Sequence, residues 1–220
     1  MDIKEAIKER HSVRQYKDLP IPDEVKEKLA ALIDTCNEES GLSIQLITDD
    51  PGCFKTFLAH YGWFKNAQHY FALVGKKDLP DLEEKCGYFG EKLVLAAQML
   101  GLRTCWVAGT YNKGKCTAKI GDDEKLVCVI LTGYGETDGA KHKSKPVGKL
   151  CDIAEEEMPV WFKNGVKAAM MAPTAMNQQK FKITLEGEDA VITAGNGPMT
   201  KIDLGILKYN FEAASGHKCR

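Results

Sequence analysis

The sequence predicts an α+β fold in which a central sheet is flanked by helices. Two long segments, residues 22–36 and 81–100, carry apolar residues at the 3.6-residue spacing of helices that bury one face. Three short, continuous apolar runs lie at residues 70–74, 104–108 and 126–131. Such runs are typical of strands buried on both faces, although periodicity alone also allows buried helix. Helices interspersed with buried strands indicate a covered sheet.

Each long helix has sequence signals at its ends or along its length. Pro22 suits the first turn of the first helix, because its missing N–H would have no partner there. In the second helix, Gly87, Gly90 and Ala97 would let another helix approach closely. That helix is expected to end at Gly101, since glycine is the usual residue after a helix C-terminus.

Length and composition exclude several classes of protein. The chain has 220 residues, enough for one domain or for one domain with an added lobe. Hydrophobic residues make up 44% and charged residues 28%, which excludes a disordered chain. The 30 basic and 31 acidic residues nearly cancel without a basic arm, so no nucleic-acid partner is expected. No apolar run approaches the roughly 20 residues of a membrane span. Without a secretion signal either, we expect a cytoplasmic protein with no membrane partner.

Eight cysteines raise the question of a metal site or a disulfide framework. They contain no Cys-x-x-Cys pair and have no histidine at ligand spacing. Cys105 and Cys128 lie inside apolar runs, where cysteine behaves as a small hydrophobe. We expect reduced, buried thiols and no metal ion, and a thiol or metal protein is a disfavoured alternative.

The composition changes at residues 137–149 to glycine, lysine, histidine and serine, which predicts a surface connection. We therefore divide the chain into a core of residues 1–150 and a C-terminal lobe of residues 151–220. Roughly seventy residues is small for an independent core, so the lobe is expected to pack against the core.

The lobe has its own predicted elements. A helix that contains Trp161 stops near Pro173. Alternating residues at 180–185 and 190–194 flank a polar turn and predict a hairpin. Thr200, with Asp203 three residues on, resembles a capping box for a last helix.

A candidate anion site follows the first helix of the chain. In an extended segment, Arg10, Ser12 and Arg14 would point the same way. Two guanidinium groups and a hydroxyl suit a phosphate. The alternative is a solvated, charged helix end. A second basic cluster at residues 141–145 could close on the same phosphate, or could be a solvated loop.

Two further segments could meet a flat ligand. Pro173 ends a helix, and Asn177 can donate and accept at once, as a flavin or purine edge requires. Gly109, directly after a predicted strand, allows close approach of a ligand to the backbone. Proline, asparagine and glycine in turns also need no ligand to explain them.

Together these motifs resemble those of the FMN-dependent nitroreductases, and more narrowly a branch labelled putative TM nitroreductase. Arg10-His11-Ser12-Val13-Arg14 is similar to the family's opening Arg-x-Ser-x-Arg/Lys motif, which holds the FMN phosphate and ribityl chain. Residues 88–102 resemble the long helix of the family's dimer core, and Lys143-Ser144-Lys145 its late Lys-Ser-Arg phosphate clamp. The resemblance covers most of residues 1–150 and implies a nitroreductase-like fold with a central mixed sheet.

One family motif stands in an unexpected place. The usual Pro-Ser-x-x-Asn-x-Gln pattern is absent at residues 36–42, and a similar pattern occurs at residues 172–178. In the family this motif reaches across a homodimer to the flavin of the partner. We therefore expect residues 151–220 to imitate the partner half and complete the flavin site in cis, with one FMN per chain and no obligatory dimer.

The resemblance implies an FMN-dependent NAD(P)H oxidoreductase that passes electrons to a small, nitroaromatic or quinone-like acceptor. NADH or NADPH would be the donor, and the flavin would carry the chemistry, so no side chain is assigned as catalytic. The alternative is a flavin-binding carrier or sensor without turnover. Aromatic residues around His60, Tyr61 and Trp63 lie where the family often contacts flavin or substrate, although core packing is the commoner role. The expected cofactor-binding residues are Arg10, His11, Ser12, Arg14, Ala108, Gly109, Lys143, Lys145, Pro173, Thr174, Ala175 and Asn177.

Overall fold

The fold is known from a computed structural model, which describes residues 1–55 and 62–220. The chain forms two compact units, termed here the sheet unit and the C-terminal unit. The sheet unit comprises Arg10–Leu82 and Leu93–Lys141, and the C-terminal unit comprises Met1–Glu9, Glu83–Lys92 and His142–Arg220.

The sheet unit is built on four strands in the order β1-β2-β4-β3, and each neighbouring pair is antiparallel. The three predicted strands are confirmed, whereas the short β1 carried no sequence signal. The central strands β2 and β4 are almost entirely buried, which explains their continuous apolar runs. The strands are β1 (Gln45–Ile47), β2 (Tyr70–Lys76), β3 (Arg103–Val107) and β4 (Glu124–Gly133).

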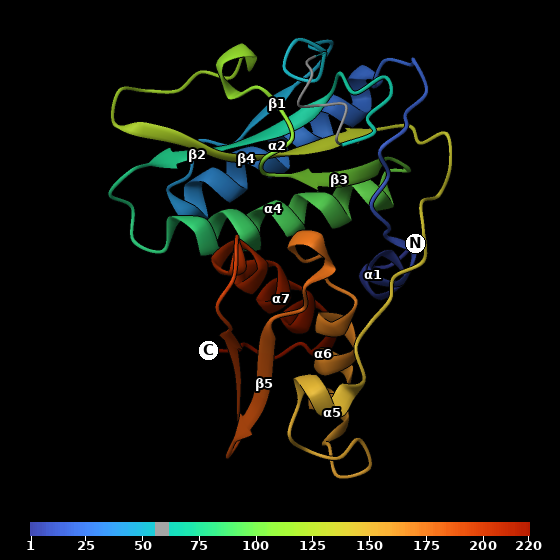
Figure 1. The fold of residues 1–220 in the computed structure, drawn as a ribbon, viewed down its shortest axis with the longest axis vertical. Helices are drawn as coiled ribbons and strands as arrows, with labels where there is room; N and C mark the ends of the chain where they lie inside the picture. Colours follow the sequence, from blue (N-terminus) through green and yellow to red (C-terminus); the bar gives the residue numbers. More distant parts are fainter. Residues whose placement is uncertain (56–61) are drawn as a thin grey trace. The chain divides into compact units, whose positions relative to one another are not determined.

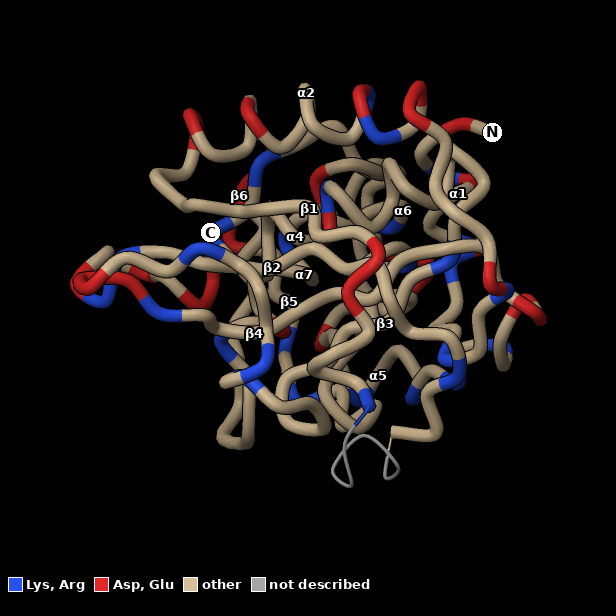
Figure 2. Tube along the Cα trace, turned by 90° about the horizontal axis from the view of Figure 1, so that it is seen from above, with Lys and Arg blue, Asp and Glu red and all other residues tan. Residues whose placement is uncertain are grey.

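Two helices flank this sheet (Figure 1). Helix α2 (Asp23–Ser40) runs one turn beyond the predicted end and stops at Gly41, whose φ of 73° lies in the left-handed region. Its apolar face is buried, while acidic and basic residues are spaced along it (Figure 2). The second half of α4 (Leu82–Met99) also belongs to this unit, and Gly101 follows it with a φ of 84°, as predicted.

The C-terminal unit packs helices against each other beside a hairpin. Phe162 of α6 and Phe211 of α7 meet edge to face, with ring centroids 5.8 Å apart. Gly165 makes room for this contact, because a Cβ there would lie 2.4 Å from the Phe211 ring. The predicted hairpin is confirmed, with Gly187 in its turn at a φ of 67°. The elements are α1 (Ile3–Glu9), α5 (Val147–Leu150), α6 (Val160–Met170), β5 (Phe181–Glu186), β6 (Asp189–Ala194) and α7 (Thr200–Ser215).

The first half of α4 groups with the C-terminal unit because it crosses α7 at two glycines. A Cβ on Gly87 would lie 2.0 Å from the Ile202 carbonyl oxygen. A Cβ on Gly205 would lie 1.9 Å from the Glu84 carbonyl oxygen. The two backbones therefore touch, which is the close helix approach that Gly87 predicts.

The predicted capping box at the start of α7 is wrong. The N-cap residue is Met199, with a φ of 59°, and no side chain caps the helix. Thr200 instead donates its hydroxyl to the Gly197 carbonyl at 3.2 Å. Asp203 accepts hydrogen bonds from a turn far away in the sequence, described below.

All eight cysteines are free, and six of them are buried. Within the described ranges, no group of three or more His, Cys, Asp or Glu side chains is placed to hold a metal ion. No helix in these ranges combines the length and apolar character needed to cross a membrane.

Candidate functional site

The segment that carries Arg10, Ser12 and Arg14 is extended, as predicted, and lies along β3. The Val13 N–H donates to the Thr104 carbonyl at 2.9 Å, and Ser12 forms an isolated parallel bridge with Thr104. This bridge adds a parallel component at the β3 edge of the otherwise antiparallel sheet. Because side chains alternate in extended backbone, the two arginines and the serine share one side of the segment.

The positive charges of Arg10 and Arg14 converge on one point of β3. Burial raises the pKa of the Cys105 thiol, and the charges of Arg14 and Arg10 oppose that shift. Both guanidinium groups therefore lie within electrostatic reach of one sulfur atom. Arg10 is only 4% exposed, whereas Arg14 is exposed. Two guanidinium groups on one side of a segment can offer their paired donors to one anionic group.

The neighbours of this segment present further donors. Ser12 is half-buried, and among the described residues its hydroxyl makes no hydrogen bond. The Nδ1 atom of His11 is buried and has no hydrogen-bond partner in the described part of the chain. Gly139 holds the segment in place: its φ is 80°, and a Cβ there would lie 2.9 Å from the Ser12 carbonyl oxygen. The connection predicted at the surface thus packs partly against the arginine segment.

Ala108 and Gly109 form a bend directly after β3. Gly109 is exposed, and nothing in the described structure lies within 4 Å of the position that a Cβ would take. The bend is therefore sterically open, and it directly follows the strand that carries Cys105. A flat ligand could approach this backbone without meeting a side chain.

In the C-terminal unit, the predicted residues Lys143, Lys145 and Asn177 are brought together by Gln179. The Gln179 side chain donates to the Lys143 carbonyl at 2.8 Å and accepts from the Lys145 N–H at 2.7 Å. It also donates to Asn177 Oδ1 at 3.0 Å. Gln179 is 4% exposed, so one buried amide connects the two segments.

This network occupies groups that the sequence assigned to the ligand. Asn177 uses Nδ2 to donate to the Lys143 carbonyl at 3.0 Å, in addition to accepting from Gln179. The Lys145 ammonium donates to the carbonyls of Gln178 and Gln179, at 2.7 and 3.0 Å. Both side chains therefore brace the turn. The Lys143 ammonium is exposed and makes no ion pair with the described residues.

Asp203 is the main residue that the sequence analysis missed in this turn. Its carboxylate accepts from the Ala175 N–H at 2.9 Å and from the Gln178 amide at 2.8 Å. Burial raises its pKa, and these two hydrogen bonds partly offset the shift. An aspartate in the first turn of a helix is an ordinary feature. Its spacing from Thr200 predicted a helix cap, and nothing in the sequence indicated a bond to the distant turn.

The turn itself is strained. Met176, Asn177 and Gln179 all have positive φ angles, of 54°, 52° and 45°. Left-handed backbone is costly for residues other than glycine and is concentrated at functional sites. Thr174 steadies the turn by accepting the Gln179 N–H at 3.1 Å. Pro173 and Thr174 are half-buried, whereas Met176 is 82% exposed.

The aromatic residues around position 60 are only partly described. His60 and Tyr61 lie outside the described residues. Trp63 is 79% exposed and has a φ of 57°, so core packing is not its role.

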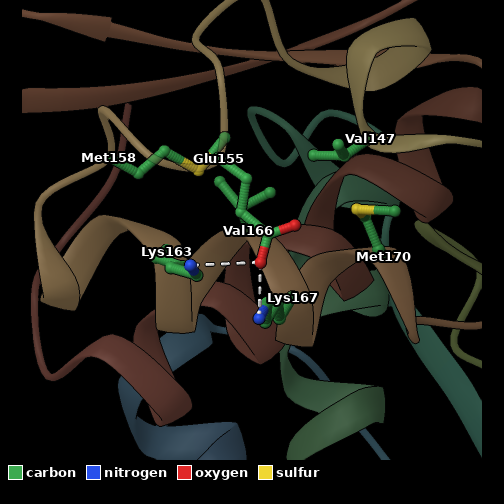
Figure 3. A pocket seen from close by; sticks show the side chains of 7 residues that line it. All are labelled: Val147, Glu155, Met158, Lys163, Val166, Lys167 and Met170. Atoms are coloured by element: carbon green, nitrogen blue, oxygen red, sulfur yellow. Dashed lines mark ion pairs between the residues drawn. The ribbon is translucent and has the colours of Figure 1, made fainter.

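A separate cavity in the C-terminal unit contains none of the predicted cofactor-binding residues (Figure 3). Glu155 forms ion pairs with Lys163 at 3.1 Å and Lys167 at 2.7 Å at its mouth. The rest of its lining is apolar. These residues are Val147, Met158, Val166 and Met170.

The donor set of the sheet unit fits the phosphate of a flavin mononucleotide. Arg10 and Arg14 offer planar forks that match phosphate oxygens, and Ser12 offers a hydroxyl. The unpartnered Nδ1 of His11 belongs to the same segment, but alternation places the His11 side chain on the opposite side from these three.

Residues 2–215 match the family model described as "Putative TM nitroreductase". The chain belongs to this family.

Solved structures of the nitroreductase fold resemble the whole chain or its larger part. A protein from Thermotoga maritima, described as a putative nitroreductase, has a TM-score of 0.70 at 23% identity and covers 97% of this chain and 83% of its own. A Desulfovibrio desulfuricans nitroreductase in complex with FMN has a TM-score of 0.55 at 21% identity, covering 71% and 98%. An FMN-dependent nitroreductase from Clostridium difficile has a TM-score of 0.52 at 17% identity, covering 70% and 96%.

These likenesses confirm the nitroreductase-like fold. The search of curated proteins gave no match.

Proposed function

We propose that this nitroreductase-family chain is an FMN-dependent NAD(P)H oxidoreductase that reduces a small acceptor of nitroaromatic or quinone type. The observation that carries the proposal is the placement of Arg10, Ser12 and Arg14 on one side of the extended segment paired with β3, where the charges of both arginines act on Cys105. Family membership and the FMN named for the Desulfovibrio relative support the choice of cofactor.

The residues of the sheet unit would hold the cofactor by its phosphate. Arg10, already buried, supplies a fixed positive charge, and Arg14 supplies a second fork from the exposed side. Ser12 donates its hydroxyl between them. The open bend at Ala108 and Gly109 offers backbone to the flat ring system.

When bound, FMN supplies the redox chemistry, taking a hydride from NADH or NADPH and passing electrons to the acceptor. The chain's share is to bind and orient it, and no side chain is assigned as acid or base. In the C-terminal unit, Lys143 has an ammonium available for phosphate, and the braced turn at Pro173, Thr174, Ala175 and Asn177 offers backbone groups. Lys145 acts by holding that turn.

The test is to reconstitute the purified chain with FMN and add NADH or NADPH without oxygen. A reductase loses its flavin absorbance rapidly, and the colour returns when a quinone or nitroaromatic compound is added. Binding of FMN without bleaching by either donor would assign the chain as a carrier or sensor. A chain that does not bind FMN would overturn the proposal.

A further inference from the structure

We propose that Cys53 and Cys116 form a redox-reactive pair that hydrogen peroxide converts into a disulfide. Both lie in the sheet unit, in loops outside the candidate flavin-binding segments. Cys53 follows β1 in a turn after Pro51, and Cys116 follows the short helix η1 (Lys113–Lys115). The inference does not depend on the proposed reductase activity.

The two loops touch directly beside the pair. The Asn112 N–H donates to the Cys53 carbonyl at 3.0 Å, so Cys53 itself contacts the loop that carries Cys116. A Cβ added to Gly52 would lie 3.5 Å from the Lys115 carbonyl oxygen, and these two residues directly precede the two cysteines. A disulfide requires the two Cα atoms to lie within about 7 Å. Contact between the residues that precede the cysteines is the backbone approach that such a bond needs.

A tyrosine hydroxyl links one of the two cysteines to the buried cluster that contains the other. Tyr70 donates its hydroxyl hydrogen to Asp50 Oδ2 at 2.6 Å. Cys116 Sγ lies 3.3 Å from the Tyr70 oxygen, and because the tyrosine hydrogen is used by Asp50, the Cys116 thiol is the donor there. Cys53 and Tyr70 belong to one cluster of buried side chains, and Cys116 packs against the same cluster. The two thiols therefore lie in one small region of the core.

Exposure gives the two cysteines different roles. Cys116 is half-buried and so open to a small oxidant, whereas Cys53 is fully buried. Burial, together with the neighbouring Cys116, raises the pKa of Cys53 to about 12. Cys53 therefore stays protonated and does not itself react readily with peroxide, which leaves Cys116 as the sulfur that is oxidised first.

The chemistry is balanced with one equivalent of peroxide. The Cys116 sulfur attacks the O–O bond, which forms a sulfenic acid and releases water. The Cys53 sulfur then attacks the Cys116 sulfur, the S–O bond breaks, and hydroxide leaves with the Cys53 proton as a second water. Two thiols are oxidised by two electrons, and the peroxide is reduced to two water molecules.

A half-buried cysteine elsewhere provides a matched control. Cys219 resembles Cys116 in exposure. Burial raises the pKa of Cys219 to about 12, as it does for Cys53. Its sulfur lies 3.7 Å from Glu212 Oε1, and the groups that act on it are charged residues rather than a thiol. Oxidation at Cys219 therefore has no resolving partner.

The experiment treats the reduced full-length chain with a small excess of hydrogen peroxide. Thiols are then counted under denaturing conditions, and the peptides are mapped by mass spectrometry. We expect the count to fall from eight to six, with one Cys53–Cys116 peptide. Closing a loop of roughly sixty residues should also raise the thermal midpoint by several degrees. Cys116→Ala should form no cross-link, and Cys219→Ala should behave like the wild type.

Three results would overturn the proposal: a thiol count that stays at eight, a disulfide between other cysteines, or conversion of Cys116 to sulfinic acid with Cys53 still free. Peptide mapping of the wild-type chain decides among them even if a variant fails to fold. The measurement needs no flavin, so loss of the proposed reductase activity would not affect its outcome.

Discussion

At the scale of single residues, Arg10 illustrates how burial changes the meaning of a charge. A basic residue after a helix is ordinarily solvated and contributes little. Arg10 is only 4% exposed, and its charge acts together with that of Arg14 on the buried Cys105. Two guanidinium groups on one side of an extended segment suit the oxygens of a phosphate.

Replacing either arginine by glutamine should weaken FMN binding. A hydrogen bond to a charged group contributes about 1.5–3 kcal/mol, which corresponds to roughly a ten- to hundredfold rise in the Kd for FMN. Arg14→Gln is the cleaner variant because Arg14 is exposed. The measurement is titration with FMN followed by flavin fluorescence.

Two controls separate phosphate binding from general damage. Riboflavin lacks the phosphate, so its affinity should be the same for Arg14→Gln and the wild type. Arg103→Gln removes a guanidinium of β3 that is already paired with Asp138 at 2.7 Å. This variant should leave FMN affinity unchanged. An equal loss of affinity for riboflavin and FMN would contradict the phosphate role.

At the scale of elements, the crossing of α4 and α7 depends on the absence of side chains. Helix propensity alone favours alanine over glycine by about 1 kcal/mol. At Gly87 and Gly205 that preference is overridden, because a Cβ would lie about 2 Å from a carbonyl oxygen of the other helix. The tertiary contact therefore decides the residue.

Gly205→Ala should lower the free energy of unfolding by about 1–3 kcal/mol, since overpacking of a close contact outweighs the gain in helix propensity. Gly148→Ala in α5 is the matched control, because nothing in the described structure lies within 4 Å of its Cβ position. That variant should be neutral or slightly more stable. Urea denaturation measures both, and equal stability of the two variants would show that α4 and α7 are not in close contact.

At the scale of the whole molecule, the displaced motif at residues 172–178 raises the question of how many chains make one flavin site. In the C-terminal unit this motif is a strained turn, held by Gln179 and Asp203. Backbone strain of this kind is maintained only where the surroundings determine it strongly. A turn held by these hydrogen bonds would present its backbone groups to a ligand in a fixed geometry.

We predict one FMN bound per chain on a monomer. The reason is that residues 151–220 would supply in cis what the partner subunit supplies in the usual homodimer. Light scattering of the FMN-loaded chain, with the flavin released and counted, measures both quantities. One FMN per chain on a stable dimer would retain the reductase and refute the completion of the site in cis.

Much of the fold was predictable because periodicity reports local burial. The runs at 70–74 and 126–131 became the buried central strands, and the alternation in residues 180–194 became the hairpin. The three-residue β1 is too short to show a period. The predicted capping box did not form because the Asp203 carboxylate accepts hydrogen bonds from Ala175 and Gln178 and not from the start of its own helix.

The sequence by itself determined the family, the α+β class, the main helices and strands, and the extended arginine segment. Each of these depends on the types and spacing of residues that are close together in the chain. Only the tertiary structure decided which partners the polar side chains have. Lys145 and Asn177 join two segments that lie more than thirty residues apart in sequence, as their bonds across 33 and 34 positions show. Cys53 and Cys116, from two loops remote in sequence, likewise lie at one cluster of buried side chains that contains Tyr70. Hydrogen bonds and thiol pairs depend on distance in space, and distance in space between remote segments is set by packing of the core.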